Sequence, residues 1–337
     1  MKKLFKKFNL SIISLVFALT LCFGGIALSA PKKVDAAEYV AQANSTQYVT
    51  LQEAFASATD GVQTNIKLLA DVTTTEIIQI AAEKNVVFNL NGFNLINPND
   101  GVFRILGTFC IKGNGSVKGA SEGATISTIN VGQTGTLVLE GGTITSLGGT
   151  GNRCIYSQGT VTIKGGSIEN GSAENGGGIY SSGTLTINGG TISNNRATGG
   201  GGIFSQGTLT INGGTISNNT ADDGGGIYST GGTLTISDGT ISNNTANNGG
   251  GIYAVGYCTV DITNGAIEQN DAVNDGGGIF FAKGRLKMTG GTILSNTAGG
   301  NGGGIFNVSD NSNTNLVEIA GGFYRVKHSR GQWRWHF

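Results

Sequence analysis

Residues 200–219 read GGGIFSQGTLTINGGTISNN, and this stretch decides the fold because near copies of it lie before and after it. Three phrases recur in fixed order: Gly-Gly-Gly-Ile-Tyr/Phe, Gly-Thr-Leu-Thr-Ile-Asn-Gly-Gly and Thr-Ile-Ser-Asn-Asn. The isoleucine of the first phrase falls at Ile155, Ile179, Ile203, Ile227, Ile252, Ile279 and Ile305. The isoleucine of the third phrase falls at Ile144, Ile168, Ile192, Ile216, Ile241, Ile267 and Ile293. Both markers return every 24 to 27 residues, so the chain is an array of one structural unit.

Each phrase is short, rich in β-branched residues and bounded by Gly or Asn, which is typical of a strand between turns. Three strands per unit, each stacked on its equivalent one coil later, predict a right-handed parallel β-helix over residues 61–324, an all-β fold. Alternation points Leu185 and Ile187 inward, and Ile179 and Ile192 complete the core of that coil. We expect Gly to supply the positive-φ corners. We also expect hydrogen bonds from coil to coil within one column of asparagines: Asn195, Asn219, Asn244, Asn270 and Asn296.

The repeat gives the composition a structural reason. Gly accounts for 59 of the 337 residues, while only 2 are Pro and charged residues make up 12%. The low Pro count argues against a collagen-like or Pro-rich disordered chain. Corners between strands account for much of the Gly, and the strands supply the hydrophobic 38%.

The two ends of the chain depart from the repeat. Residues 1–36 have a Lys-rich start followed by an apolar run, which predicts a secretory signal peptide and an exported protein. Residues 37–60 predict an N-terminal cap, a strand and a short helix that begins at the capping box Thr50–Glu53. Residues 325–337 form a basic aromatic tail with both Trp and both His. We favour an interrupted reading frame for this tail over a membrane- or wall-binding role.

Charge and cysteine content exclude several classes of partner. Residues 37–324 hold 11 basic and 20 acidic residues, so we expect no nucleic-acid partner. No further stretch is long and apolar enough to cross a membrane, so we expect no transmembrane segment in the mature chain. Cys110, Cys154 and Cys258 are an odd, widely spaced set, which predicts packed residues instead of disulfides or a zinc site.

The Gly-Gly-Gly-Ile and Ile-Ser-Asn-Asn phrases resemble those of right-handed parallel β-helix proteins of the pectin-lyase-like superfamily. Within it they are most similar to the repeats of bacterial surface proteins such as polymorphic membrane proteins. The resemblance covers about residues 61–322 and implies the fold. It leaves the function open, because the superfamily holds polysaccharide lyases and glycoside hydrolases as well as adhesins.

Acidic residues of the repeat are the first candidates for chemistry. Asp222 and Asp223 are adjacent, and Asp275 occupies the same loop column, so weak Ca²⁺ binding is one interpretation and solvated turns are the other. No His, Lys or Arg of the repeat lies nearby, which disfavours acid–base catalysis by the Asp pair. We predict no catalytic residue and no cofactor other than this candidate Ca²⁺. Asp261, Lys287 and Glu318 share an outward column and predict a ladder of alternating charges.

A column of aromatic residues is the candidate ligand-binding surface. It consists of the residues that follow the marker isoleucines: Tyr156, Tyr180, Phe204, Tyr228, Tyr253, Phe280 and Phe306. An inward Ile column places these rings outward, in a strip about 29 Å long at ~4.8 Å per coil. Exposed aromatic strips mark binding surfaces, and flat rings suit sugar faces. The alternative is that the rings stack on one another and only stabilise the solenoid.

These observations predict a non-enzymatic bacterial protein, secreted or on the cell surface, that presents a rigid face for adhesion or glycan binding. Its expected partners are glycans or surface proteins of a host or the environment. The alternative is a polysaccharide lyase or glycoside hydrolase. Polar positions that conform to the repeat favour the binding protein, whereas a non-repeat cluster of acids and bases on one outer face would favour the enzyme.

Overall fold

The computed structural model describes residues 38–119, 127–308, 315–327 and 333–336, and these described residues cluster as one compact unit. The predicted signal peptide, residues 1–36, lies outside the described residues. Within the described part of the chain, no helix is long and apolar enough to cross a membrane.

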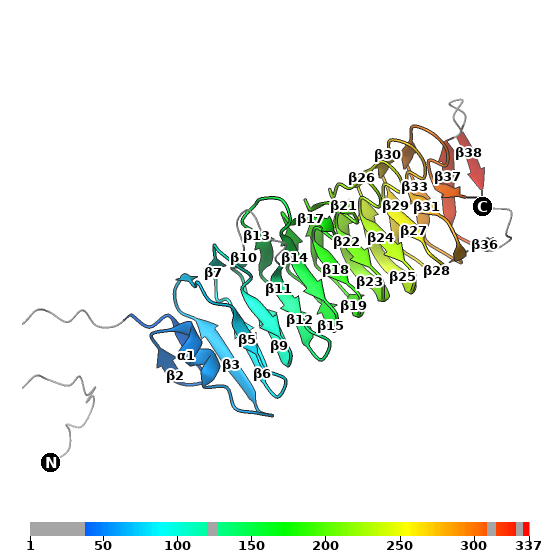
Figure 1. Ribbon diagram of the computed structural model, residues 1–337. Coiled ribbons are helices and arrows are strands. Elements are labelled where there is room, and N and C mark those ends of the chain that lie inside the picture. Colours follow the sequence, from blue (N-terminus) through cyan, green and yellow to red (C-terminus); the bar gives the residue numbers. More distant parts are fainter. Residues whose placement is uncertain (1–37, 120–126, 309–314, 328–332, 337) are drawn as a thin grey trace, which may run out of the picture. The chain divides into compact units, whose positions relative to one another are not determined.

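The chain folds into a parallel β-solenoid of about ten coils, as the repeat predicts (Figure 1). One face is a ten-stranded parallel sheet in which each strand pairs with its equivalent in the next coil. In spatial order its strands are β5 (Ile78–Ile80), β8 (Phe103–Ile105), β11 (Ser127–Val131), β14 (Arg153–Ser157), β18 (Ile179–Ser181), β22 (Ile203–Ser205), β24 (Ile227–Thr230), β27 (Ile252–Val255), β31 (Ile279–Phe281) and β35 (Ile305–Asn307).

The other two faces belong to one 23-stranded sheet, because β23 and β25 run through the bend between them. The second face comprises β3 (Gln63–Leu68), β6 (Asn85–Asn89), β9 (Thr108–Lys112), β12 (Thr136–Leu139), β15 (Thr160–Ile163), β19 (Thr184–Ile187), the first halves of β23 (Thr208–Ser217) and β25 (Thr233–Ser242), β28 (Cys258–Ile262), β32 (Gly284–Met288) and β36 (Asn315–Ile319). The third comprises β4 (Val72–Thr73), β7 (Asn94–Asn97), β10 (Ser116–Gly119), β13 (Thr143–Ser146), β16 (Ser167–Glu169), β20 (Thr191–Ser193), the second halves of β23 and β25, β29 (Ala266–Glu268), β33 (Thr292–Leu294) and β37 (Phe323–Lys327).

Short strands also pair at the corner that leads back to the first face. β17 (Ser172–Asn175) and β21 (Arg196–Gly199) form a two-stranded sheet. β26 (Thr245–Ala246), β30 (Asp271–Ala272) and β34 (Thr297–Ala298) form a three-stranded sheet.

Aliphatic columns fill the interior of the solenoid. Ile179, Leu185, Ile187 and Ile192, the four core residues predicted for one coil, are each at most 1% exposed. Their equivalents one coil later lie in register with them, so each side chain packs on a like side chain above and below. The predicted core is therefore confirmed.

Glycine does more than form corners. Gly200, first of its triplet, has a φ of 65° and makes a corner, as predicted. Gly201 and Gly202 do not have positive φ: a Cβ on Gly201 would lie 2.6 Å from the Gly225 carbonyl oxygen, and one on Gly202 would lie 2.7 Å from that of Gly226. These two glycines are needed because stacked backbones approach closely there. At another corner the positive φ belongs mainly to Asn, as in Asn218 (φ 57°), because Asn tolerates this conformation.

The asparagine column forms the predicted ladder. Its five members, at most 1% exposed, are Asn195, Asn219, Asn244, Asn270 and Asn296. The Asn195 amide Nδ2 donates to Asn219 Oδ1 at 3.0 Å, and the same bond links each later pair at 2.9–3.0 Å. Each Oδ1 from Asn219 onward also accepts from the backbone N–H of the preceding ladder residue. The ladder therefore saturates polar groups that would otherwise be buried unpaired.

A small N-terminal element packs against the first coils. β1 (Ala41–Ala43) pairs antiparallel with β2 (Thr46–Tyr48) and with β3, and α1 (Leu51–Ala56) follows. The Thr50 hydroxyl accepts from the Glu53 N–H at 3.2 Å and caps the helix. Phe55 of α1 is 8% exposed, and its ring centroid lies 5.4 Å from that of Phe88 and 5.8 Å from that of Phe103. The helix thus covers core side chains of the first coils.

Part of the C-terminal tail continues the sheet, although its sequence carries none of the repeat phrases. β37 pairs parallel with β33 of the preceding coil. β38 (Trp333–His336) pairs antiparallel with β37 and takes its edge. The backbone hydrogen bonds that form this pairing do not depend on side-chain identity, which is why the sequence pattern gave no signal for it.

Candidate functional site

The aromatic residues that follow the marker isoleucines form one outward column on the ten-stranded sheet. Consecutive members lie in register, for example Tyr156 with Tyr180 and Tyr180 with Phe204. The adjacent marker isoleucines Ile179 and Ile203 are fully buried, so alternation turns the rings outward. We call this column, Tyr156 to Phe306, the aromatic ladder.

The rings of the ladder stack on one another. Centroids of consecutive rings are 4.6–5.3 Å apart. Four of the six pairs are within 21° of parallel. Phe204, in the middle, is only 8% exposed although it points outward. The rings therefore face outward, as expected, and they also stabilise each other by stacking, with each pair worth about 0.5–1.5 kcal/mol. A ligand-binding role for the column stays a prediction.

Stacking limits what the ladder can offer a ligand. Each inner ring has both faces covered by its neighbours, so it presents mainly its edge to solvent. Only the rings at the two ends, Tyr156 and Phe306, have one neighbour instead of two. A flat sugar face therefore has a platform at the ends of the ladder, while the middle offers a ridge of ring edges and phenol hydroxyls.

The column continues past Tyr156 with polar residues from the earlier coils. Tyr156 lies in register with Asn130, Asn130 with Arg104, and Arg104 with Gln79. These coils lack the first phrase, Gly-Gly-Gly-Ile-Tyr/Phe, so the sequence did not assign Arg104 and Asn130 to the column. Spacings of 25 and 26 residues from Gln79 to Arg104, Asn130 and Tyr156 were the only signal available.

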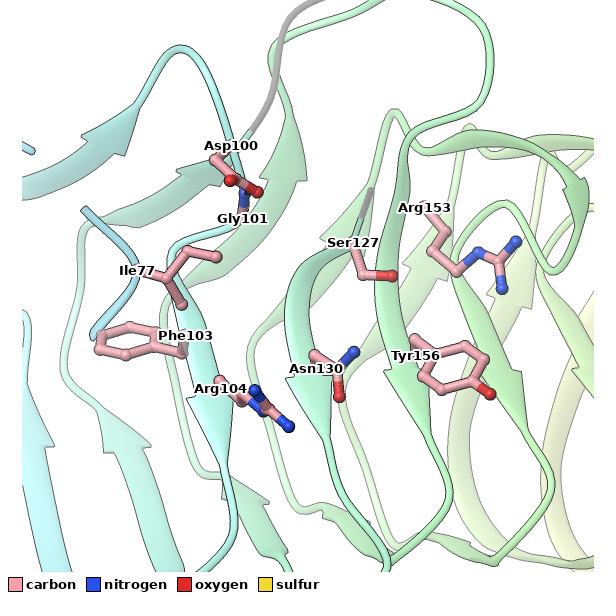
Figure 2. Close-up of a pocket in the computed structure, with 9 residues that line it drawn as sticks. All are labelled: Ile77, Asp100, Gly101, Phe103, Arg104, Ser127, Asn130, Arg153 and Tyr156. Carbon is pink, nitrogen blue, oxygen red and sulfur yellow. Dashed lines mark hydrogen bonds between the residues drawn. The ribbon is translucent and has the colours of Figure 1, made fainter. Parts of the chain in front are cut away.

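A pocket of about 410 Å³ opens where the polar and aromatic parts of the column meet (Figure 2). We call it the head pocket and define it by six of its lining residues: Asp100, Arg104, Ser127, Asn130, Arg153 and Tyr156. Figure 2 shows that Arg104, Asn130 and Tyr156 come from three successive strands and face the same space. Its volume lies in the range of small-molecule sites.

Two arginines give the head pocket its character. The Arg153 guanidinium carbon lies 5.5 Å from the Tyr156 ring centroid and 5.2 Å from that of Tyr180, a cation–π contact with both rings. Burial lowers the pKa of Arg153, and the nearby Tyr156, Tyr180 and Glu174 oppose that shift. The guanidinium stays protonated at neutral pH. Among the described residues, neither Arg104 nor Arg153 forms an ion pair with a carboxylate.

The charged groups beside the ladder differ along its length. Burial raises the pKa of Tyr228, and the Asp223 carboxylate raises it further. The same two causes, with Tyr228 added, raise the pKa of Tyr253 to about 12. The middle of the ladder therefore lies beside negative charge, whereas Arg153 flanks its first two rings.

The candidate calcium residues do not gather. Asp223 pairs with Asn248 in the next coil, and the Asn248 amide donates to the Asp223 carboxylate at 2.9 Å. Asp275 likewise accepts from the Asn301 amide at 3.1 Å. Among the described residues no three His, Cys, Asp or Glu side chains come together. Acids alternate with amides in this column, and a Ca²⁺ role for Asp222, Asp223 and Asp275 stays a prediction.

The charge column differs from its expected form in one respect. Asp261, Lys287 and Glu318 lie in register in consecutive coils, as predicted. The ion pairs, however, are made by Arg285, whose Nη1 lies 3.3 Å from Asp261 Oδ1 and whose Nη2 lies 3.9 Å from Glu318 Oε2. Its longer, forked side chain reaches both carboxylates. All these groups are about one-third exposed or more, which makes the pairs weak contributors to stability.

The cysteines are poorly placed for chemistry. Cys110, Cys154 and Cys258 are free, and the last two are buried. Burial raises the pKa of Cys154 to about 12, and burial together with Glu140 raises that of Cys110 to about 11. Thiols with such pKa values are weak nucleophiles at neutral pH.

One family model matches the chain, over residues 213–230 and 238–255. It describes the Chlamydia polymorphic membrane protein repeat. Each matched segment runs from the turn before a third-phrase isoleucine to the aromatic ladder, and together they contain Asn219, Asn244, Tyr228 and Tyr253. The chain is thus a β-helix repeat protein that resembles polymorphic membrane proteins. Comparison with curated proteins and with solved structures gives no match, and the pectin-lyase-like part of the resemblance stays a prediction.

Proposed function

We propose that this chain is a secreted or cell-surface protein that binds glycans or surface proteins through the outward column of its ten-stranded sheet and catalyses no reaction. The match to a repeat of polymorphic membrane proteins supports a place at the cell surface. The predicted signal peptide, residues 1–36, agrees with export.

The observation that carries this proposal is the continuous column from Arg104 to Phe306. It joins a pocket with hydrogen-bond donors to a long aromatic ridge, and both lie on a sheet whose strands are locked in register. A ligand meeting this face would find rigid partners, so little conformational entropy is lost on binding. Aromatic residues and arginine are also the residue types that dominate binding surfaces.

A glycan array with the mature chain tests the proposal. The ladder variant replaces Tyr180, Phe204 and Tyr228 with Ser, and the matched control is Tyr257→Asn. Tyr257 is 69% exposed, and its φ of 63° is one that Asn accepts. We expect the array to show bound glycans whose signal falls in the ladder variant and persists in the control. Unchanged binding by a folded ladder variant would refute a role for the ladder.

The alternative, a polysaccharide lyase or glycoside hydrolase, has a direct test on the same material. We expect no cleavage of polygalacturonate or other uronate polymers. Calcium-dependent release of unsaturated products that disappears in the variant with both Asp222→Asn and Asp223→Asn would establish the enzyme instead.

A further inference from the structure

We propose that the head pocket is an anion subsite: it binds the carboxylate or sulfate of an acidic sugar whose ring packs against Tyr156. This inference rests on the proposed glycan-binding function and specifies the ligand class and the place where the ligand is held.

The head pocket is lined by more positive than negative side chains. Arg104 and Arg153 both line the pocket and form no ion pair with a carboxylate among the described residues, whereas Asp100 is the one acid of the six defining residues. The Asp100 Oδ1 already accepts from the Gly101 N–H at 2.6 Å. The lining residues hold two guanidiniums and one carboxylate, so the lining carries a net positive charge, on a solenoid body with 11 basic and 20 acidic residues. Glu174 lies outside the lining but is near enough to Arg153 to raise its pKa, and it offsets part of this charge. A positively charged pocket on an acidic surface attracts anions locally, while the surrounding surface repels them.

The polar groups of the head pocket are arranged to suit one acidic sugar. A guanidinium presents its donors in a planar fork that matches the oxygens of a carboxylate or sulfate. The cation–π contact fixes the Arg153 side chain beside the rings of Tyr156 and Tyr180. Ser127 and Asn130 add a hydroxyl and an amide on the same side of the pocket, which suits the hydroxyl groups of a sugar (Figure 2). The charged group and the ring of one acidic sugar would therefore find partners together.

The Tyr156 end of the ladder differs from its middle in two ways that favour an acidic ligand. Tyr156 is the terminal ring, with a face that no ladder ring covers, and it lines the pocket. Farther along, the ladder offers ring edges, and Asp223 lies close enough to Tyr228 and Tyr253 to raise their pKa values. An anion is attracted at Tyr156 and repelled at the middle of the ladder. The two parts of this face thus differ in charge, and an anionic ligand prefers the Tyr156 end.

Three polymers with the same glucose backbone provide the test: dextran, carboxymethyl-dextran and dextran sulfate. Arg104→Gln removes one exposed guanidinium of the pocket. Arg196→Gln, on the exposed face of β21, makes the same change in net charge away from it. We expect the mature chain to bind at least one acidic polymer about tenfold more tightly than dextran. Arg104→Gln should reduce the ratio of the affinity for the acidic polymer to the affinity for dextran by at least about fivefold. Arg196→Gln should leave this ratio unchanged.

The outcomes separate this inference from the proposed function. Equal binding of all three polymers would overturn the anion subsite and leave glycan binding standing, whereas no binding to any of them, together with an empty glycan array, would overturn both. An equal effect of Arg196→Gln would also overturn the subsite, because general electrostatic attraction would explain it. Preference for carboxymethyl-dextran or for dextran sulfate would identify which oxyanion the pocket takes.

Discussion

Replacement of Asn219 by Ala tests how the solenoid holds its corner together. The Asn219 side chain is fully buried and makes four hydrogen bonds. Its Nδ2 donates to the Ile192 carbonyl and to Asn244 Oδ1, both at 3.0 Å. Its Oδ1 accepts from the backbone N–H and the side-chain amide of Asn195, also at 3.0 Å. Alanine removes all four and leaves the Asn195 N–H without this partner in the interior.

A buried hydrogen bond contributes about 1 kcal/mol net, so four lost bonds predict about 4 kcal/mol of destabilisation. The control is Asn212→Ala, which removes a single exposed bond to Asn188 Oδ1 at 2.9 Å and should cost less than about 0.5 kcal/mol. Equilibrium urea unfolding of the mature chain, followed by circular dichroism, measures both free energies. If Asn219→Ala unfolds within about 0.5 kcal/mol of the unmodified chain, the ladder does not stabilise the corner and the reasoning fails.

Two further substitutions test the interior by the same unfolding assay. Ser181→Ala should raise the free energy of unfolding by about 1 kcal/mol, because the buried Ser181 hydroxyl has no hydrogen-bond partner among the described residues; a loss of stability would show that this hydroxyl is paired. Gly202→Ala should cost about 3 kcal/mol, since its Cβ would lie 2.7 Å from the Gly226 carbonyl oxygen. Gly61→Ala, in open space at a φ of 69°, should cost only about 1 kcal/mol, and the reverse order would contradict the close-packing role of the glycine triplets.

Periodicity made most of the fold predictable. The two marker isoleucines fix the coil length, alternation along Leu185 and Ile187 fixes which side is buried, and the recurring second Asn of the third phrase predicts the ladder. The glycine triplets were harder to interpret, because a sequence does not distinguish a glycine with positive φ, such as Gly200, from Gly201, which is required by a neighbouring backbone. The ion pairs of Arg285 were not predicted for a related reason. The repeat shows which residues lie in register, but it does not show that the Arg285 side chain is long enough to reach carboxylates in the two neighbouring coils.

The candidate site was predictable only in its regular half. The aromatic ladder follows the repeat, so it was found from the sequence. The sequence did not decide whether its rings form an exposed binding strip or stack on one another. The head pocket lies where the repeat phrases fade, and its residues share a column only through strand pairing: Arg104 with Asn130, and Asn130 with Tyr156. Arg104 and Asn130 do not follow the repeat phrases, so the sequence pattern gave no reason to single them out.

The most direct test of the account is the stoichiometry with which a short carboxymethyl-dextran oligosaccharide binds, measured by titration calorimetry on the mature chain. Tyr156→Ala and Phe306→Ala each remove one terminal ring and its contact with one neighbouring ring, and Tyr156→Ala also removes the cation–π contact of Arg153 with that ring. We expect one oligosaccharide to bind per chain, with binding lost in Tyr156→Ala and kept in Phe306→Ala. Several bound molecules per chain, or equal losses in the two variants, would contradict a site at the Tyr156 end.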